Sequence, residues 1–246
     1  MSSMQTVNGV TVYRADPQGE PKGALVVIHE IWGLVPHIMD VADRYAAEGY
    51  LVMAPDLLSD VGVTPEIGLE LMAMMNEPDE AIRTANQPRL REAFAANQAP
   101  EFAGTAVAKL KAVVDALEAE PGIEGRIGVL GFCFGGSYSF ALAEADDRVR
   151  AAVPFYGSAQ PSEVATIHCP VLAFYGDQDV RLVDALPALE AATRDAGVDF
   201  TAQVYADAGH AFFNDTNPNT FNPAAAGDAW GRSLEFLQAN LDELNR

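Results

Sequence analysis

The chain has 246 residues, of which 49% are hydrophobic, so it can bury one large core, and we expect a single domain over residues 1–246. It carries 15 Lys and Arg against 35 Asp and Glu, and the resulting net charge of −20 would repel nucleic-acid phosphates and anionic lipid headgroups. No apolar stretch reaches the length of a membrane span and no signal-peptide pattern begins the chain, so we expect a cytoplasmic protein with neither nucleic acid nor membrane as partner.

Apolar runs of strand length alternate with helical patterns along the chain. Several runs, such as "ALVVIHE", are almost continuously apolar, which is typical of parallel strands covered by helices on both faces. The alternation predicts an α/β fold with a mostly parallel central sheet flanked by helices. In chain order, we expect strands at 9–15 and 24–30, a helix at about 37–48, a strand at 50–56, a helix at 103–119, a strand at 126–132, a helix at 134–145, strands at 150–157 and 170–177, a helix at 183–196, a strand at 200–206 and a helix at 225–243.

Residues 60–102 interrupt this alternation. The segment has a helical pattern that we expect to be broken at four prolines, Pro65, Pro78, Pro88 and Pro100. It predicts a helical insertion within the domain. Such an insertion can cover a site at the sheet edge or merely connect two strands, and the pattern is compatible with both.

The stretch "GFCFGG" joins the strand at 126–132 to the helix at 134–145. Gly131 and Gly135 stand two residues before and two after Cys133, the spacing of a nucleophile elbow, where larger residues would crowd the apex of a sharp turn. The helix N-terminus would also favour a thiolate and supply an oxyanion donor. The alternative is a small buried cysteine in a tight turn. A dinucleotide fingerprint fails, because it requires glycine where Cys133 stands.

Candidate partners for the cysteine follow two later strands. Asp177 and Asp179 come after the strand at 170–177, and His210 comes after the strand at 200–206, which is the nucleophile, acid, histidine order of an α/β-hydrolase. His210 would accept the thiol proton while an aspartate holds the imidazole tautomer. We favour Asp179 as the acid, because Asp177 is nearer the strand end and better placed to cap the turn.

The remaining cysteine and histidines have simpler interpretations. Cys169 is expected to be a small buried residue, and His37 and His168 to be structural or solvated. The spacing of these residue types matches no metal site, so we predict neither metal nor cofactor. His29 and Glu30 end the strand expected at 24–30, and the loop "IWGLVPH" that follows them has backbone N–H groups that could complete an oxyanion hole. The Glu30 carboxylate is either a surface group or a charge beside the nucleophile.

Four motifs, "HEIWG", "GFCFGG", "YGDQDV" and "GHAFF", in this order and spacing, resemble the dienelactone hydrolase family of α/β-hydrolases over nearly the whole chain. A cysteine in G-x-C-x-G-G is the most specific mark, since most of the superfamily has serine there. The resemblance implies Cys133 as nucleophile, Asp179 as acid, His210 as base, Ile31 and Phe134 as backbone donors of the oxyanion hole, and Glu30 as a carboxylate that interacts with the cysteine and helps form the thiolate when substrate binds.

One position departs from the family pattern. Family members that bind a substrate carboxylate have an arginine four residues after the catalytic histidine, where this chain has Asn214. A second such arginine lies in the family's helical insertion, where Arg83, Arg89 and Arg91 are candidates. The resemblance implies a cofactor-free hydrolase that opens a small-molecule lactone or carboxylic ester through an acyl-thioester. The departure at Asn214 and the net charge of −20 favour neutral substrates. A redox-sensitive thiol protein and a non-catalytic binding module are the alternatives.

Overall fold

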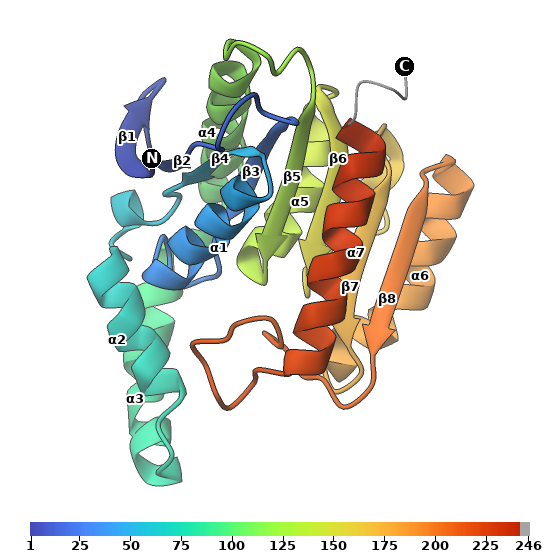
Figure 1. Cartoon of the computed structure of the whole chain (residues 1–246). Coiled ribbons are helices and arrows are strands. Elements are labelled where there is room, and N and C mark those ends of the chain that lie inside the picture. The colour runs from blue at the N-terminus through green and yellow to red at the C-terminus, as the bar shows by residue number, and fades with distance from the viewer. Residues whose placement is uncertain (242–246) are drawn as a thin grey trace.

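The computed structural model describes residues 1–241, which fold around an eight-stranded sheet in the order β1-β2-β4-β3-β5-β6-β7-β8 (Figure 1). The strands are β1 (Ser3–Val7), β2 (Val10–Ala15), β3 (Ala24–Ile28), β4 (Leu51–Pro55), β5 (Ile127–Phe132), β6 (Val149–Phe155), β7 (Val171–Gly176) and β8 (Phe200–Tyr205). β2 pairs antiparallel with β1 and β4, and every other neighbouring pair is parallel. The predicted α/β-hydrolase fold is confirmed.

The helices cover both faces of the sheet. They are α1 (Pro36–Ala47), α2 (Pro65–Met75), α3 (Glu80–Phe94), α4 (Pro100–Glu118), α5 (Phe134–Ala145), α6 (Val180–Ala196) and α7 (Pro223–Leu241). α1 and α7 lie on one face, and α4, α5 and α6 lie on the other (Figure 1). Right-handed crossovers place α1 on one face and α4, α5 and α6 on the other, because the connection from β3 to β4 crosses the sheet in the direction opposite to the later connections, and α7 follows the last strand. The carboxyl ends of all the parallel strands lie on the same side of the sheet, and Cys133, Asp179 and His210 follow three of these ends.

Three sequence expectations need correction. The strand expected at 24–30 ends at Ile28, so Glu30 lies in a loop. Pro88 lies inside α3 and does not break the helix. The proline leaves the Thr84 carbonyl without its helical hydrogen-bond donor, but both residues are exposed, so water can bind this carbonyl. β1 was not predicted at all, since four of its five residues are exposed and supply no buried apolar pattern. Residues 242–243, the last two of the helix expected at 225–243, lie outside the described residues.

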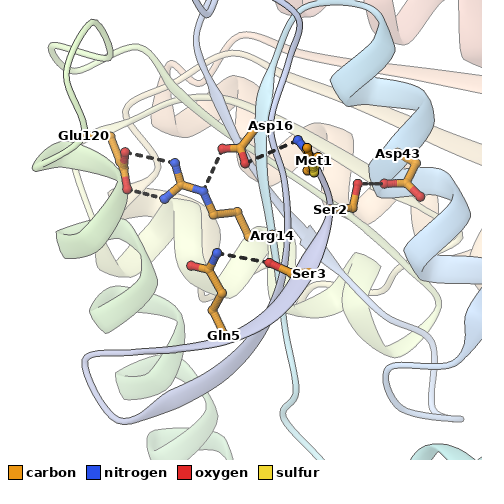
Figure 2. A network of polar contacts seen from close by, with 8 residues as sticks. All are labelled: Met1, Ser2, Ser3, Gln5, Arg14, Asp16, Asp43 and Glu120. Carbon is orange, nitrogen blue, oxygen red and sulfur yellow. Dashed lines mark hydrogen bonds and ion pairs between the residues drawn. The ribbon is translucent and has the colours of Figure 1, made fainter.

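Polar contacts tie the β1–β2 hairpin to the helices. The Arg14 guanidinium makes a bidentate contact with Glu120, which follows α4, and its Nε lies 2.8 Å from Asp16 Oδ1 (Figure 2). The Ser2 hydroxyl donates to Asp43 on α1. These contacts involve half-buried or exposed groups, so each contributes little stability by itself. Together they connect the outermost strands, β1 and β2, to α1 and to the end of α4.

The helical insertion packs over the edge of the sheet where the parallel strands end. Its buried side chains join Leu58, which precedes it, and Ala106 of α4 in a second apolar cluster, whose other members are Val63, Leu71, Leu90, Phe94 and Phe102. Ile31 and Trp32, from the loop after β3, and Phe134, from the start of α5, pack against this cluster. A Cβ at Gly68 in α2 would lie 1.8 Å from the Trp32 carbonyl oxygen. The insertion therefore covers the loop that follows β3. None of the helices within residues 1–241 is long and apolar enough to cross a membrane.

Candidate active site

Cys133 stands at the apex between β5 and α5 in a strained conformation, with φ +57° and ψ −110°. Its backbone N–H donates to the Phe155 carbonyl at 3.0 Å. A Cβ at Gly131 would lie 2.2 Å from the Gly135 carbonyl oxygen, and a Cβ at Gly135 would lie 2.2 Å from the Ile28 carbonyl oxygen. The crowding predicted at both glycines is confirmed. A non-glycine residue with positive φ costs free energy, and such strain is typical of functional sites.

The structure brings His210 together with Asp179 and Cys133. The His210 Nδ1 atom pairs with Asp179 Oδ2, and the Asp179 side chain is only 10% exposed. Burial would lower the pKa of His210, but its hydrogen bonds with Asp179 and Cys133 raise it to about 10. Burial would likewise raise the pKa of Asp179, but His210 lowers it below its ordinary value. The imidazole is thus held in one orientation beside the thiol and favours its protonated form.

Asp177 does not compete for this histidine. It is exposed, and its backbone N–H donates to the Tyr205 carbonyl at 2.9 Å as the chain leaves β7. Asp179, two residues later, is the N-cap residue of α6, and its carboxylate reaches His210. The structure therefore pairs Asp179 with His210, as favoured from the sequence.

Glu30 is buried beside these groups, with only 1% of its surface exposed. The Asn214 amide Nδ2 donates to its Oε2 at 2.7 Å, and the Tyr156 hydroxyl lies 3.4 Å from its Oε1. Burial raises the pKa of Glu30 to about 7, although the two hydrogen bonds and the charge of His210 act in the opposite direction. Of the two interpretations left open by the sequence, the surface carboxylate is wrong.

Tyr156 was not identified from the sequence. It follows β6 with φ +39°, and its ring centroid lies 5.1 Å from that of His210. Burial, followed by the charges of Glu30 and Cys133, raises the pKa of its hydroxyl well above the ordinary value. The tyrosine therefore remains neutral and can donate to Glu30. Its position at the end of a parallel strand, in "PFYG", was the available signal.

The predicted substrate-binding residues lie in different surroundings. Asn214 is 1% exposed. Its amide donates to Glu30, and its Oδ1 accepts from the backbone and hydroxyl of Thr216. Its amide therefore reaches Glu30, and a direct contact with substrate stays a prediction. Arg83 donates to the Glu77 and Pro78 carbonyls at the turn between α2 and α3. Arg89 and Arg91 are exposed on α3.

The remaining predicted groups have clear positions. Phe134 is the first residue of α5, so its N–H has no intrahelical acceptor. Within the described residues the Ile31 N–H makes no backbone hydrogen bond. Cys169 is buried at the entrance to β7, and burial raises the pKa of its thiol to about 12. Residues 1–241 contain no cluster of three or more His, Cys, Asp or Glu side chains suited to a metal.

Comparison with known proteins gives a consistent result. Residues 10–241 match the model described as "Dienelactone hydrolase family". A "Putative carboxymethylenebutenolidase" from Saccharolobus solfataricus is 33% identical, with 93% of each chain covered. A protein of the same name from Escherichia coli is 30% identical, with 94% of this chain and 83% of that one covered. The crystal structure of a "Putative Dienelactone Hydrolase" from Klebsiella pneumoniae subsp. pneumoniae has a TM-score of 0.80 and 26% identity, with 96% of this chain and 98% of that one covered.

The family match spans nearly all of the described chain and includes each of the four motifs that carry the resemblance. The strand order agrees with it, since the cysteine follows β5, the aspartate follows β7 and the histidine follows β8. Sequence, fold and site geometry together show that this protein is a hydrolase belonging to the dienelactone hydrolase family.

Proposed function

We propose that the protein hydrolyses a neutral lactone or small carboxylic ester by nucleophilic catalysis at Cys133. The observation that carries this proposal is the His210 imidazole, whose Nδ1 pairs with Asp179 and whose pKa is raised both by Asp179 and by the neighbouring Cys133 at a strained elbow. A relay of cysteine, histidine and aspartate is the arrangement that generates a nucleophilic sulfur and returns a proton to a leaving group.

In the first half of the reaction, the Cys133 thiolate attacks the carbonyl carbon and forms a C–S bond. The carbonyl electron pair moves to oxygen, where the N–H groups of Ile31 and Phe134 stabilise the negative charge. When the intermediate collapses, the carbonyl re-forms and the ester C–O bond breaks. Protonated His210 gives its Nε2 proton to the departing alkoxide, which in a lactone remains part of the same molecule. An acyl-thioester and a neutral imidazole are left.

Water completes the turnover. Neutral His210 takes a proton from the attacking water, the new C–O bond forms, and the C–S bond breaks to release a carboxylic acid and return the thiolate. Asp179 stays ionised throughout and stabilises the imidazolium at both stages. The ester and one water give one acid and one alcohol, so the reaction needs no cofactor.

In the proposed mechanism Glu30 is a negative charge near the reacting sulfur, since the charges of both Glu30 and Cys133 act on the Tyr156 hydroxyl. An ionised carboxylate opposes the formation of a second anion nearby. In the proposed mechanism, displacement of this charge when substrate binds promotes the thiolate, as the family resemblance implies. Asn214 holds the carboxylate with a neutral amide, where an arginine would bring a positive charge for an anionic substrate. The presence of asparagine in place of this arginine supports a neutral substrate.

The test compares Cys133→Ala with Cys169→Ala, using a p-nitrophenyl ester as substrate. We expect Cys133→Ala to lose about 10³-fold or more in kcat/KM with an unchanged melting temperature, because the nucleophile and its base act as a unit. Cys169→Ala should keep nearly the wild-type rate. Iodoacetamide should inactivate the wild-type enzyme. An alanine variant at position 133 that retains more than about a tenth of the activity would contradict the cysteine mechanism.

The same experiment separates the two alternatives. A redox-sensitive thiol protein would be alkylated selectively at Cys133 without turning over the ester. A binding module would neither hydrolyse the ester nor react selectively.

A further inference from the structure

His29 is a completely buried histidine that the proposed mechanism does not use. It follows the last residue of β3, and its Nδ1 lies 2.6 Å from the Glu30 carbonyl oxygen. Its Nε2 lies 3.1 Å from the backbone nitrogen of Leu57, in the segment that follows β4. A carbonyl can only accept and a backbone N–H can only donate, so the imidazole is neutral and carries its proton on Nδ1. Burial, which lowers the pKa of His29, favours the same uncharged form.

This hydrogen bond orients the peptide between Glu30 and Ile31. In a trans peptide the C=O and the N–H point in opposite directions. The Glu30 carbonyl is held toward the His29 ring and also accepts from the Gly33 N–H at 3.1 Å. The Ile31 N–H is therefore directed away from the ring, and it forms no backbone hydrogen bond within residues 1–241.

The same ring contacts the second predicted oxyanion donor. The His29 and Phe134 rings stack with centroids 5.7 Å apart and planes within 3°. The Phe134 ring in turn packs against Tyr138, with centroids 4.5 Å apart. Backbone contact reinforces this arrangement, since a Cβ at Gly135 would lie 2.6 Å from the His29 carbonyl oxygen. The loop after β3 and the start of α5 are thus fixed to each other at His29.

We propose that His29 is a positioning residue that holds the N–H groups of Ile31 and Phe134 in the geometry of an oxyanion hole. It acts on one donor through the Glu30 carbonyl and on the other through ring stacking. A pre-oriented donor lowers the barrier because no reorganisation is needed when negative charge appears on the substrate oxygen. This inference rests on the proposed function, since an oxyanion forms only if an acyl group is transferred.

Two substitutions separate the two ring nitrogens. An asparagine amide reaches the position of Nδ1, so His29→Asn can still donate to the Glu30 carbonyl but leaves the Leu57 N–H without an acceptor. A glutamine reaches the position of Nε2, so His29→Gln can accept from Leu57 but loses the bond that orients the peptide. A purely structural role predicts that the less stable variant is also the less active one. Positioning through the Glu30 carbonyl predicts that His29→Gln is the less active variant whichever of the two is more stable.

The measurements are kcat and KM for p-nitrophenyl acetate, affinity for a trifluoromethyl ketone and the rate of alkylation by iodoacetamide. We expect His29→Gln to lose about 10²-fold in kcat with KM nearly unchanged, the loss typical of one misplaced oxyanion donor. Affinity for the ketone, whose thiol adduct carries an oxyanion, should fall in parallel. Alkylation should stay within about threefold of wild type, because it forms no oxyanion. His168→Gln, at an exposed histidine, is the matched control and should change none of these values.

Several outcomes would overturn the inference. They are wild-type kcat in His29→Gln, a lower kcat in His29→Asn than in His29→Gln, or alkylation that falls together with hydrolysis. If neither variant folds, NMR of the nitrogen-labelled wild-type protein still tests the hydrogen bonds. A proton on Nε2, or a charged imidazolium at neutral pH, would contradict them. Failure of the proposed function would be visible separately, as hydrolysis that survives Cys133→Ala.

Discussion

Replacing Glu30 by glutamine should make the protein more stable and less active. The carboxyl group has a pKa of about 7 in the folded protein against an ordinary value of 4.5. Below pH 4.5 it is protonated in both states. Between pH 4.5 and about 7 it is protonated only in the folded state, so the free energy of unfolding decreases as the pH rises. At about 1.4 kcal/mol per pH unit, the decrease reaches about 3 kcal/mol and persists at higher pH.

The variant Glu30→Gln stays neutral at every pH and can keep both hydrogen bonds, accepting from Asn214 and donating to the Tyr156 oxygen. Its advantage in unfolding free energy over wild type should therefore be near zero at pH 4.5 and about 3 kcal/mol at pH 8. Urea denaturation across this range measures the difference. Glu70→Gln, at an exposed position on α2, is the control and should show no such pH-dependent gain. A difference that is equal at pH 4.5 and pH 8 would refute the reasoning.

Loss of the Glu30 charge should also change the chemistry. Without a carboxylate opposing the thiolate, Glu30→Gln should react with iodoacetamide faster than wild type at the same pH. Turnover should nevertheless fall, because the charge no longer responds to substrate. In the wild-type enzyme, a bound carboxylic acid that displaces the charge should accelerate alkylation. Equal alkylation rates with and without the acid would contradict this role.

Three further predictions concern other parts of the site. Asp179→Asn should lower kcat by about 10³-fold, because the imidazole loses its orientation and its counter-charge, whereas Asp177→Asn should stay near wild type; steady-state hydrolysis of the p-nitrophenyl ester measures both. A carboxylated lactone should be no better a substrate than its methyl ester, because Asn214 stands in place of an arginine whose ion pair with a substrate carboxylate is commonly worth about 2–5 kcal/mol. A strong preference for the free acid in kcat/KM would disprove this. Gly135→Ala should destabilise the fold by about 3 kcal/mol or more in thermal denaturation, because its Cβ would overlap backbone oxygens, whereas Gly104→Ala, in an open part of α4, should not be destabilising.

The parts of the fold that were predictable are those with a local signal. β5 and β7 are fully buried apolar runs, and the glycines around Cys133 mark a turn that only glycine can form. β1 had no such signal, because it is an exposed edge strand held by pairing with β2 and by polar contacts across the chain. Pro88 was taken to break a helix, yet solvent can satisfy the carbonyl that the proline leaves unpaired.

The amino-acid sequence by itself determined the order of cysteine, aspartate and histidine after β5, β7 and β8, because parallel strands bring their carboxyl ends to one edge. The groups that surround Glu30, in contrast, are brought together by the tertiary fold. Asn214 lies 184 positions away in the chain and Tyr156 lies 126 away, and neither contact follows a sequence period. Burial then set the protonation of the carboxylate, because desolvation depends on atoms that several separate segments bring together around one side chain.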